Sequence, residues 1–271
     1  MFTIKNYVVA ENLEQAYELN QKRSNTILGG IGWLKMGSRN IQTAIDLSKL
    51  GLDKIQEDEE SFKIGCMCTL RDMEVNESLN SYFNGVIARS LVHIVGVQFR
   101  NCATIGGSVY SRFGFSDILT CLLSLDTYVE LHNGGIIPLS TYKDMYYDRD
   151  LLVRIIIKKD TRKVSYLTHR MSATDIPVLA VAISKLEDKW QFVLGARPQR
   201  AILVNQVDGI LSQNPTQEEI DSLVDYVIKE VKFGTNMRGS KEYRQILAKV
   251  FINRGIEEVM GGTHENQIMD K

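Results

Sequence analysis

The segment Arg100-Asn101-Cys102-Ala103-Thr104-Ile105-Gly106-Gly107-Ser108 places two adjacent glycines between a β-branched residue and a hydroxyl. Glycine allows backbone N–H groups to converge through positive φ angles, and it has no Cβ to hold an anion at a distance. A second cluster of this kind, Thr26-Ile27-Leu28-Gly29-Gly30-Ile31-Gly32-Trp33, lies far upstream. We predict that the two loops approach each other and together hold a diphosphate.

The upstream cluster does not match the two common phosphate-binding motifs. From Gly30, a G-x-G is completed by Gly32, but Lys35 occupies the third position of a Rossmann fingerprint. No Gly-Lys-Ser/Thr follows, so a Walker loop is excluded. Taken alone, the cluster is also consistent with a tight turn between a strand and a loop.

Composition narrows the class of protein. The chain has 271 residues and a formal charge of −1, so no basic bias points to nucleic acid or to an anionic membrane. No apolar run is long enough to span a membrane and no secretory leader pattern opens the chain, which predicts a cytoplasmic protein. The four cysteines do not form a disulfide framework. Strand-like alternation around Cys66 and Cys68 favours buried or half-buried thiols over a metal site.

The N-terminal part of the chain alternates short apolar runs with helix-start signals. Asn12 with Gln15, and Thr69 with Asp72, have the spacing of capping boxes. An Asn-Gly-Gly turn at 133–135 predicts a hairpin. We predict strands at 2–10, 26–28, 40–47, 62–66, 128–131 and 136–137, and helices at 12–22, from 69, at 81–95 and at 118–125.

The pattern changes beyond Lys143. A continuous apolar run at 151–157 predicts a buried strand, and three further strands are predicted at 163–170, 178–186 and 190–196. Helices are predicted from Thr216, with Glu219 completing a capping box, and over 240–260. The sequence therefore predicts an α+β protein whose two parts meet near 158–165, with a frayed end at 261–271.

Two charged residues next to the second glycine cluster have alternative interpretations. Asp117 stands where a helix begins, so it is either an N-cap or a carboxylate that accepts hydrogen bonds from sugar or ribityl hydroxyls. Arg100 either helps to neutralise the diphosphate or pairs with a nearby acid. The sequence leaves both alternatives open.

These motifs resemble those of the FAD-binding subunit of molybdenum hydroxylases, the family with the flavin subunits of xanthine, carbon monoxide and nicotinate dehydrogenases. The resemblance rests on Thr-Ile-Gly-Gly-Ser at 104–108, the hydrophobic-Gly-Gly strand end at 28–30, and Ser116-Asp117. It continues in the stretches 64–69, 175–177 and 239–244, which follow in the family's order and spacing.

The resemblance implies a two-subdomain FAD-binding fold of the vanillyl-alcohol-oxidase/CO-dehydrogenase flavoprotein type over 1–160, divided at about residue 55. A C-terminal domain with a small antiparallel sheet and helices would follow over 161–271. It places FAD against Ile27, Leu28, Gly29, Gly30, Ile31 and Gly32 on one side, against Ala103, Thr104, Gly106, Gly107, Ser108, Tyr110, Ser111 and Asp117 on the other, and against Leu151.

The sequence departs from the family pattern in two places. Ile31-Gly32 replaces a small polar residue after Gly-Gly, and Thr168-His169-Arg170 stands where the family commonly has a lysine close to the cofactor. Trp33 is predicted either to stack on the flavin or to pack in the core. No catalytic residue or metal ligand is predicted, because the histidines His93, His132, His169 and His264 are widely scattered.

The function implied by the resemblance is electron transfer within a complex. Electrons from a molybdopterin-binding large subunit would cross a [2Fe-2S] small subunit, reach FAD on this chain and leave to NAD or another acceptor. The alternative is an assembly subunit of the same fold with weak or no flavin binding. A stand-alone oxidase is disfavoured, because no separate substrate-cap domain fits in the chain. The substrate of the complex is not encoded in this chain.

Overall fold

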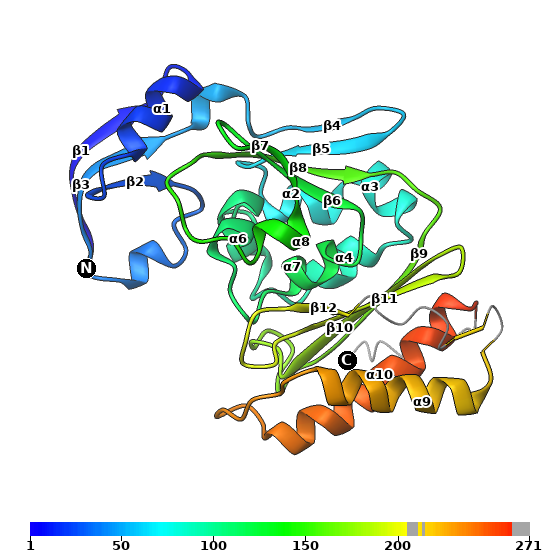
Figure 1. Ribbon diagram of the computed structural model, residues 1–271. Helices are drawn as coiled ribbons and strands as arrows, with labels where there is room; N and C mark the ends of the chain where they lie inside the picture. The colour runs from blue at the N-terminus through cyan, green and yellow to red at the C-terminus, as the bar shows by residue number, and fades with distance from the viewer. Residues whose placement is uncertain (205–210, 213–214, 262–271) are drawn as a thin grey trace. The chain divides into compact units, whose positions relative to one another are not determined.

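The computed structural model describes residues 1–204, 211–212 and 215–261, which form two compact units. The first unit comprises residues 1–113 and 125–159, and the second comprises 114–124 and 160–271. Each unit has its own β-sheet structure (Figure 1). The fold is α+β, as predicted, and each unit is described below by itself.

The first unit opens with a parallel three-stranded sheet in which β3 (Asn40–Asp46) lies between β1 (Thr3–Val9) and β2 (Asn25–Leu28). Helix α1 (Leu13–Asn20) connects β1 to β2. Asn12 caps this helix by accepting a hydrogen bond from the amide of Gln15 at 2.8 Å. The Gln15 side chain accepts from the amide of Glu11 instead of returning to Asn12, so the cap is confirmed but the reciprocal box is not.

A five-stranded antiparallel sheet forms the rest of the first unit. Strand β8 is central in the order β4-β5-β8-β6-β7 and is buried on both faces, which explains its continuous apolar run. The outer strands are β4 (Ile55–Glu57), β5 (Ser61–Gly65), β6 (Thr127–Leu131) and β7 (Gly135–Pro138), around β8 (Leu152–Lys158). The helices are α2 (Leu70–Val75), α3 (Glu77–Tyr82), α4 (Val86–Leu91), α5 (Val97–Arg100), α6 (Ile105–Ser111) and α8 (Leu139–Tyr142), with 3-10 turns at Leu34–Met36 and Ser48–Leu50.

The single helix predicted over 81–95 is wrong. Asn84 and Gly85 both have positive φ angles, 51° and 72°, which end α3 and start α4 on a new axis. Val95 is also left-handed, with φ 52°, before α5 begins. The apolar spacing predicts α4 correctly. On either side of α4 the chain turns through left-handed residues, so the helix does not continue.

The second unit is built on an antiparallel sheet with the order β12-β11-β10-β9. Alternate residues of β10, such as Val181 and Ile183, join the core beneath α9 and α10, whereas Gly195 of β11 approaches Thr120 of α7. Helices therefore cover both faces of this sheet. Because residues on both faces are buried, the strand sequence is a continuous apolar run in which the alternation of apolar and polar residues cannot be seen. The elements are α7 (Asp117–Leu122), β9 (Lys163–His169), β10 (Leu179–Leu186), β11 (Lys189–Gly195), β12 (Ile202–Val204), α9 (Gln217–Glu230) and α10 (Lys241–Val259).

Most predicted elements of the second unit are confirmed. The capping box between Thr216 and Glu219 starts α9, and Glu187 at φ 53° makes the tight connection between β10 and β11. Strand β12 was not predicted. The expectation of a frayed end concerns residues 261–271, of which 262–271 lie outside the described residues. Among the helices of the described ranges, none combines the length and apolar character that a bilayer crossing requires.

Arg244 on α10 is the largest fully buried side chain of the described chain. Its guanidinium donates to the carbonyls of Val178, Gly234 and Gly239 and to the side-chain oxygen of Asn236. All these acceptors are neutral and belong to the loops around the start of α10. Arg244 therefore joins these loops by hydrogen bonding without a salt bridge.

Replacing Arg244 by alanine is expected to lower the free energy of unfolding by at least about 3 kcal/mol, because several buried acceptors lose their donor. Arg254→Ala, on the exposed face of the same helix, is the matched control and should change stability little. Urea titration followed by circular dichroism measures both variants. Equal stability of the two variants would show that the buried guanidinium is dispensable.

Candidate functional site

The two glycine clusters lie against each other within the first unit. A Cβ on Gly30 would lie 2.7 Å from the Cα of Ala103 and inside contact distance of the Cys102 carbonyl. A Cβ on Gly29 would lie 2.9 Å from Thr104 Oγ1. Real Cβ atoms do not come this close to backbone atoms, so only glycine allows the loops to pack. The predicted approach of the two loops is confirmed.

The predicted reason for the glycines is wrong in one respect. The glycines with positive φ in the described chain are Gly51, Gly85, Gly135 and Gly261, none of which belongs to either cluster. In the first loop the left-handed residue is Ile31, with φ 49°. A β-branched residue is disfavoured in this region, so the loop stores backbone strain at Ile31. The cluster glycines provide close approach and open space, not unusual dihedral angles.

The second cluster forms the first turn of α6. Thr104 is the N-cap, and its Oγ1 accepts from the amide of Gly107 at 3.2 Å. The amides of Ile105 and Gly106 donate to the carbonyls of Cys68 and Cys66, both at 2.9 Å. These amides are thus already used within the protein. A Cβ on Gly107 would meet only Thr104 Oγ1, at 3.1 Å, so that position otherwise opens outward.

The first loop differs from the second in its amides. Within the described residues, the backbone N–H groups of Gly30, Ile31 and Gly32 have no acceptor. Successive N–H groups in an αR–αL or turn conformation can converge on an anion, and Ile31 has the left-handed φ that such a conformation contains. Both loops were expected to donate amides to a ligand. The first loop has free amides, whereas those of residues 105–107 in the second loop already have acceptors within the protein.

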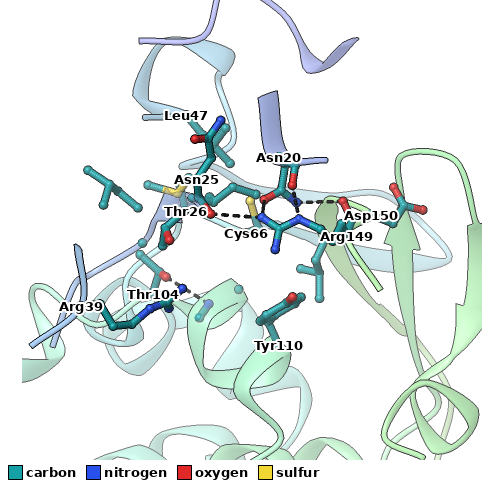
Figure 2. A pocket seen from close by; sticks show the side chains of 17 residues that line it. Asn20, Asn25, Thr26, Arg39, Leu47, Cys66, Thr104, Tyr110, Arg149 and Asp150 are labelled. Atoms are coloured by element: carbon teal, nitrogen blue, oxygen red, sulfur yellow. Dashed lines mark hydrogen bonds between the residues drawn. The ribbon is translucent and has the colours of Figure 1, made fainter. Parts of the chain in front are cut away.

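A pocket opens beside the two loops (Figure 2). Its volume is about 210 Å³, below the roughly 300–1,000 Å³ typical of a site that encloses a whole ligand, so it suits one portion of a dinucleotide. Of the predicted site residues, those that line it are Ile27, Leu28, Gly29, Thr104, Gly106, Gly107 and Tyr110. The lining residues that were not predicted are Asn20, Asn25, Thr26, Arg39, Leu47, Cys66, Met67, Arg149, Asp150 and Leu152.

The other predicted residues of the first unit lie near the pocket but outside its lining. Leu151 is buried, and its neighbour Leu152 lines the pocket. The hydroxyls of Ser108 and Ser111 donate to carbonyls one helical turn earlier, those of Thr104 and Gly107. Gly30 packs against Ala103 where the two loops touch, and Gly32 lies against the ring of Phe99. Ile31 stands between these two glycines in the first loop.

Asp117 belongs to the second unit, and its side chain is engaged there. The N-cap of α7 is Ser116, which accepts from the amide of Leu119, so the N-cap interpretation of Asp117 is wrong. Asp117 Oδ1 accepts from the hydroxyl of Tyr166 at 2.6 Å and from the guanidinium of Arg170. Burial raises the pKa of Asp117, and Arg170 opposes that rise. Contact between Asp117 and a cofactor stays a prediction.

Contacts decide between the two interpretations of Arg100. For Trp33 they exclude the core, and stacking on the flavin stays a prediction. Arg100 is buried and forms a bidentate salt bridge with Glu74, with N–O distances of 2.7 and 2.9 Å. Arg100 therefore pairs with an acid, the second of its two interpretations. Trp33 is half exposed and tilts against Phe113 at a centroid distance of 5.4 Å, so it is not a core residue.

Asn25 provides a test of whether the pocket fits a polar ligand. Its side chain is 2 % exposed, and its amide nitrogen donates to the carbonyl of Leu19 at 2.8 Å. Its Oδ1 is buried without a partner among the described residues. An unpaired buried acceptor is costly, so a donor from a bound molecule would satisfy it. Nothing in the sequence separates Asn25 from an ordinary residue at a strand start.

Family comparisons agree with this geometry. Residues 2–159 match the model of the FAD binding domain in molybdopterin dehydrogenase, and residues 165–259 match the CO dehydrogenase flavoprotein C-terminal domain. These matches define the class: an FAD-binding flavoprotein subunit of an oxidoreductase. The chain belongs to the family of FAD-binding subunits of molybdenum hydroxylases, which confirms the predicted resemblance and cofactor.

Relatives of similar length are found by sequence and by structure. The uncharacterized protein YgfM of Escherichia coli K12 is 24% identical over 254 residues, covering 92% of this chain and 94% of its own. A carbon monoxide dehydrogenase from Hydrogenophaga pseudoflava matches with a TM-score of 0.85 at 16% identity, over 96% and 98% of the two chains. Quinoline 2-oxidoreductase from Pseudomonas putida 86 matches with the same TM-score at 15% identity and the same coverage. These likenesses show a shared fold.

Replacing Gly30 by alanine is expected to lower the free energy of unfolding by about 2 kcal/mol, because the added Cβ overlaps the Cys102 carbonyl and forces the loops apart. Gly107→Ala is the matched control, since its Cβ meets only one hydroxyl. Chemical denaturation of both variants provides the comparison. If Gly30→Ala is as stable as Gly107→Ala, the close approach of the loops is not needed.

The four cysteines should differ strongly in reactivity. Burial is the main cause that raises the pKa values of Cys66 and Cys68 to about 12, so almost no thiolate forms there at pH 8. Cys121 is buried, and Cys102 is exposed. Titration of the native protein with a thiol reagent should show one fast-reacting group. Fast reaction of a second thiol before unfolding would contradict the described burial.

Proposed function

We propose that this chain is the electron-transfer flavoprotein of a molybdenum-containing hydroxylase complex. It would receive electrons from iron–sulfur clusters on a partner subunit and pass them through FAD to NAD or another acceptor. Its expected partners are a molybdopterin-binding large subunit and a [2Fe-2S] small subunit. Two structural relatives support this assignment: a carbon monoxide dehydrogenase that lacks the Mo-pyranopterin moiety of its molybdenum cofactor, and a quinoline 2-oxidoreductase.

The observation that carries the proposal is the shared pocket of the two glycine loops. Thr26–Gly29 and Thr104–Gly107, far apart in sequence, both contribute to its lining. We assign Ile27, Leu28, Gly29, Thr104, Gly106, Gly107 and Tyr110 to cofactor contact on this basis. We extend the assignment to Gly30, Ile31, Gly32, Ala103, Ser108, Ser111, Asp117 and Leu151 on the family resemblance.

FAD, when bound, supplies the electron chemistry, and the residues of the chain bind and orient it. The open position at Gly107 leaves room for phosphate oxygens, and the free amides of the first loop can donate to them. The buried acceptor of Asn25 can take a hydrogen bond from a ligand amine or hydroxyl. The division of residues 1–160 into subdomains near residue 55 remains part of the proposal.

The visible absorbance of the purified protein tests whether it carries flavin. Protein that carries flavin absorbs in the visible region, and denaturation should release FAD close to one equivalent per chain. Reduction of that flavin by a partner that holds iron–sulfur clusters, followed by reoxidation with NAD, would support the electron path. Bound flavin that exchanges no electrons with any such partner would overturn it.

A second candidate function is assembly without flavin, and the observation that favours it is Ile31. This residue brings a β-branched side chain, 40% exposed, into the loop at a strained left-handed φ. A colourless preparation that takes up no added FAD would favour this alternative. Tight binding of added FAD would exclude it.

Replacing Gly107 by valine is expected to abolish FAD retention, because the branched side chain occupies the open position beside the pocket. The fold should be retained, since no backbone atom lies against that Cβ. Gly37→Val is the matched control, because its Cβ makes only an ordinary contact at 3.5 Å and Gly37 does not line the pocket. Flavin content and circular dichroism of the two variants check the prediction. Normal flavin content in Gly107→Val would refute the placement.

A further inference from the structure

The pocket beside the glycine loops carries positive charge that no acid in its lining balances. Two arginines, Arg39 and Arg149, line it together with a single acid, Asp150. The Asp150 carboxylate accepts hydrogen bonds from the backbone amides of Asn133, Gly134 and Leu151, at 2.7 to 3.2 Å. It is therefore used to hold the β6–β7 turn and the start of β8, and in the described part of the chain it forms no ion pair with either arginine.

Arg149 is fixed by neutral acceptors on one side of its guanidinium. Its Nε donates to the Asn20 carbonyl, and its Nη2 donates to Asn20 Oδ1 and to the carbonyls of Lys22 and Asn25, at 3.0 to 3.1 Å. The Asn20 side chain returns a hydrogen bond to the Arg149 carbonyl at 2.8 Å. The remaining nitrogen, Nη1, has no partner among the described residues, and in Figure 2 it points away from the 20–25 segment.

Arg39 is the second cation of the pocket. Its side chain is exposed and makes no hydrogen bond or ion pair in the described part of the chain. In Figure 2 it extends toward Thr104 at the start of α6. The amides of that first turn are already donated to protein acceptors. A ligand anion at this end of the pocket must therefore be neutralised by other donors, and Arg39 is the group placed to do so.

We propose that Arg39 and Arg149 bind the diphosphate of the dinucleotide, Arg39 as a free guanidinium and Arg149 through Nη1. Guanidinium groups without a carboxylate partner are well suited to phosphate oxygens, which accept short charge-assisted hydrogen bonds. This inference rests on the proposed function and deepens it, because neither arginine follows from the glycine motifs. Ligand binding would also fix the segment between α1 and β2, since Arg149 joins that segment to the pocket.

The test measures ligand affinity of the full chain after removal of bound flavin. Isothermal titration with FAD, ADP and adenosine compares the wild type with Arg39→Gln, Arg149→Gln and the control Arg23→Gln, an exposed arginine outside the pocket lining. Each pocket variant should bind FAD and ADP about tenfold more weakly or worse, and the control should match the wild type. Affinity for adenosine, which has no phosphate, should not change.

Lysine variants distinguish charge from geometry. Arg39→Lys should retain much of the affinity, because a free point charge still attracts phosphate. Arg149→Lys should lose it, because an ammonium cannot hold the Asn20, Lys22 and Asn25 oxygens and also reach the ligand. Equal affinity of Arg149→Lys and wild type would remove Arg149 from the site.

The outcomes separate this inference from the proposed function. If the wild type binds FAD and both glutamine variants bind it equally well, the arginine site is overturned and the flavoprotein assignment stands. If the wild type binds ADP but not FAD, and the variants lose ADP, the arginine site stands and the flavin assignment fails. Binding of neither ligand by the wild type overturns both. Should Arg149→Gln unfold, Arg39→Gln decides, because the Arg39 side chain is exposed and makes no hydrogen bond or ion pair among the described residues.

Discussion

The close approach of Gly30 to the Cys102 carbonyl is the constraint on which the site depends. It brings a loop that follows a parallel strand against a loop that begins a helix, although about seventy residues separate them in the chain. No other residue type allows the two backbones to come this near. Because the loops touch directly, the space beside them is a defined pocket lined by the ends of both. Two glycines of the second loop have other roles. Gly106 allows α6 to pack against the backbone of Cys66, and the missing side chain of Gly107 leaves open space on the side of the pocket.

The electrostatics of the pocket complement this packing. The first loop has free amide donors next to the pocket, two arginines line the pocket, and the one lining acid is used by backbone amides. Asn25 adds a buried acceptor without a partner. The Asn25 acceptor is more favourable with a ligand donor than without one, since a desolvated polar group is costly when unpaired. The loop amides and the exposed Arg39 offer donors to an anion. The geometry thus supplies the reason why an anionic dinucleotide would bind at this place, independently of family resemblance.

Local patterns in the sequence were sufficient for much of the fold. Capping signals at Thr69 and Thr216 marked helix starts, and the apolar run before Lys158 marked the central strand of the larger sheet. The failures have identifiable causes. Asn84 and Gly85 break an apolar helical pattern by their dihedral angles, and the short strand β12 has too few residues for alternation to be visible.

In the site, the glycines could be found because their lack of a side chain is a chemical signal. Arg39 and Arg149 could not, because a surface arginine and a pocket arginine look alike until the fold brings them together.

A structure of the chain in complex with FAD tests the central claim most directly. We expect the diphosphate to lie beside Gly29 and Gly107, with phosphate oxygens within hydrogen-bonding distance of the free amides of residues 30–32. The claim is contradicted if the diphosphate binds elsewhere on the molecule while the two loops keep their contact and their pocket stays empty.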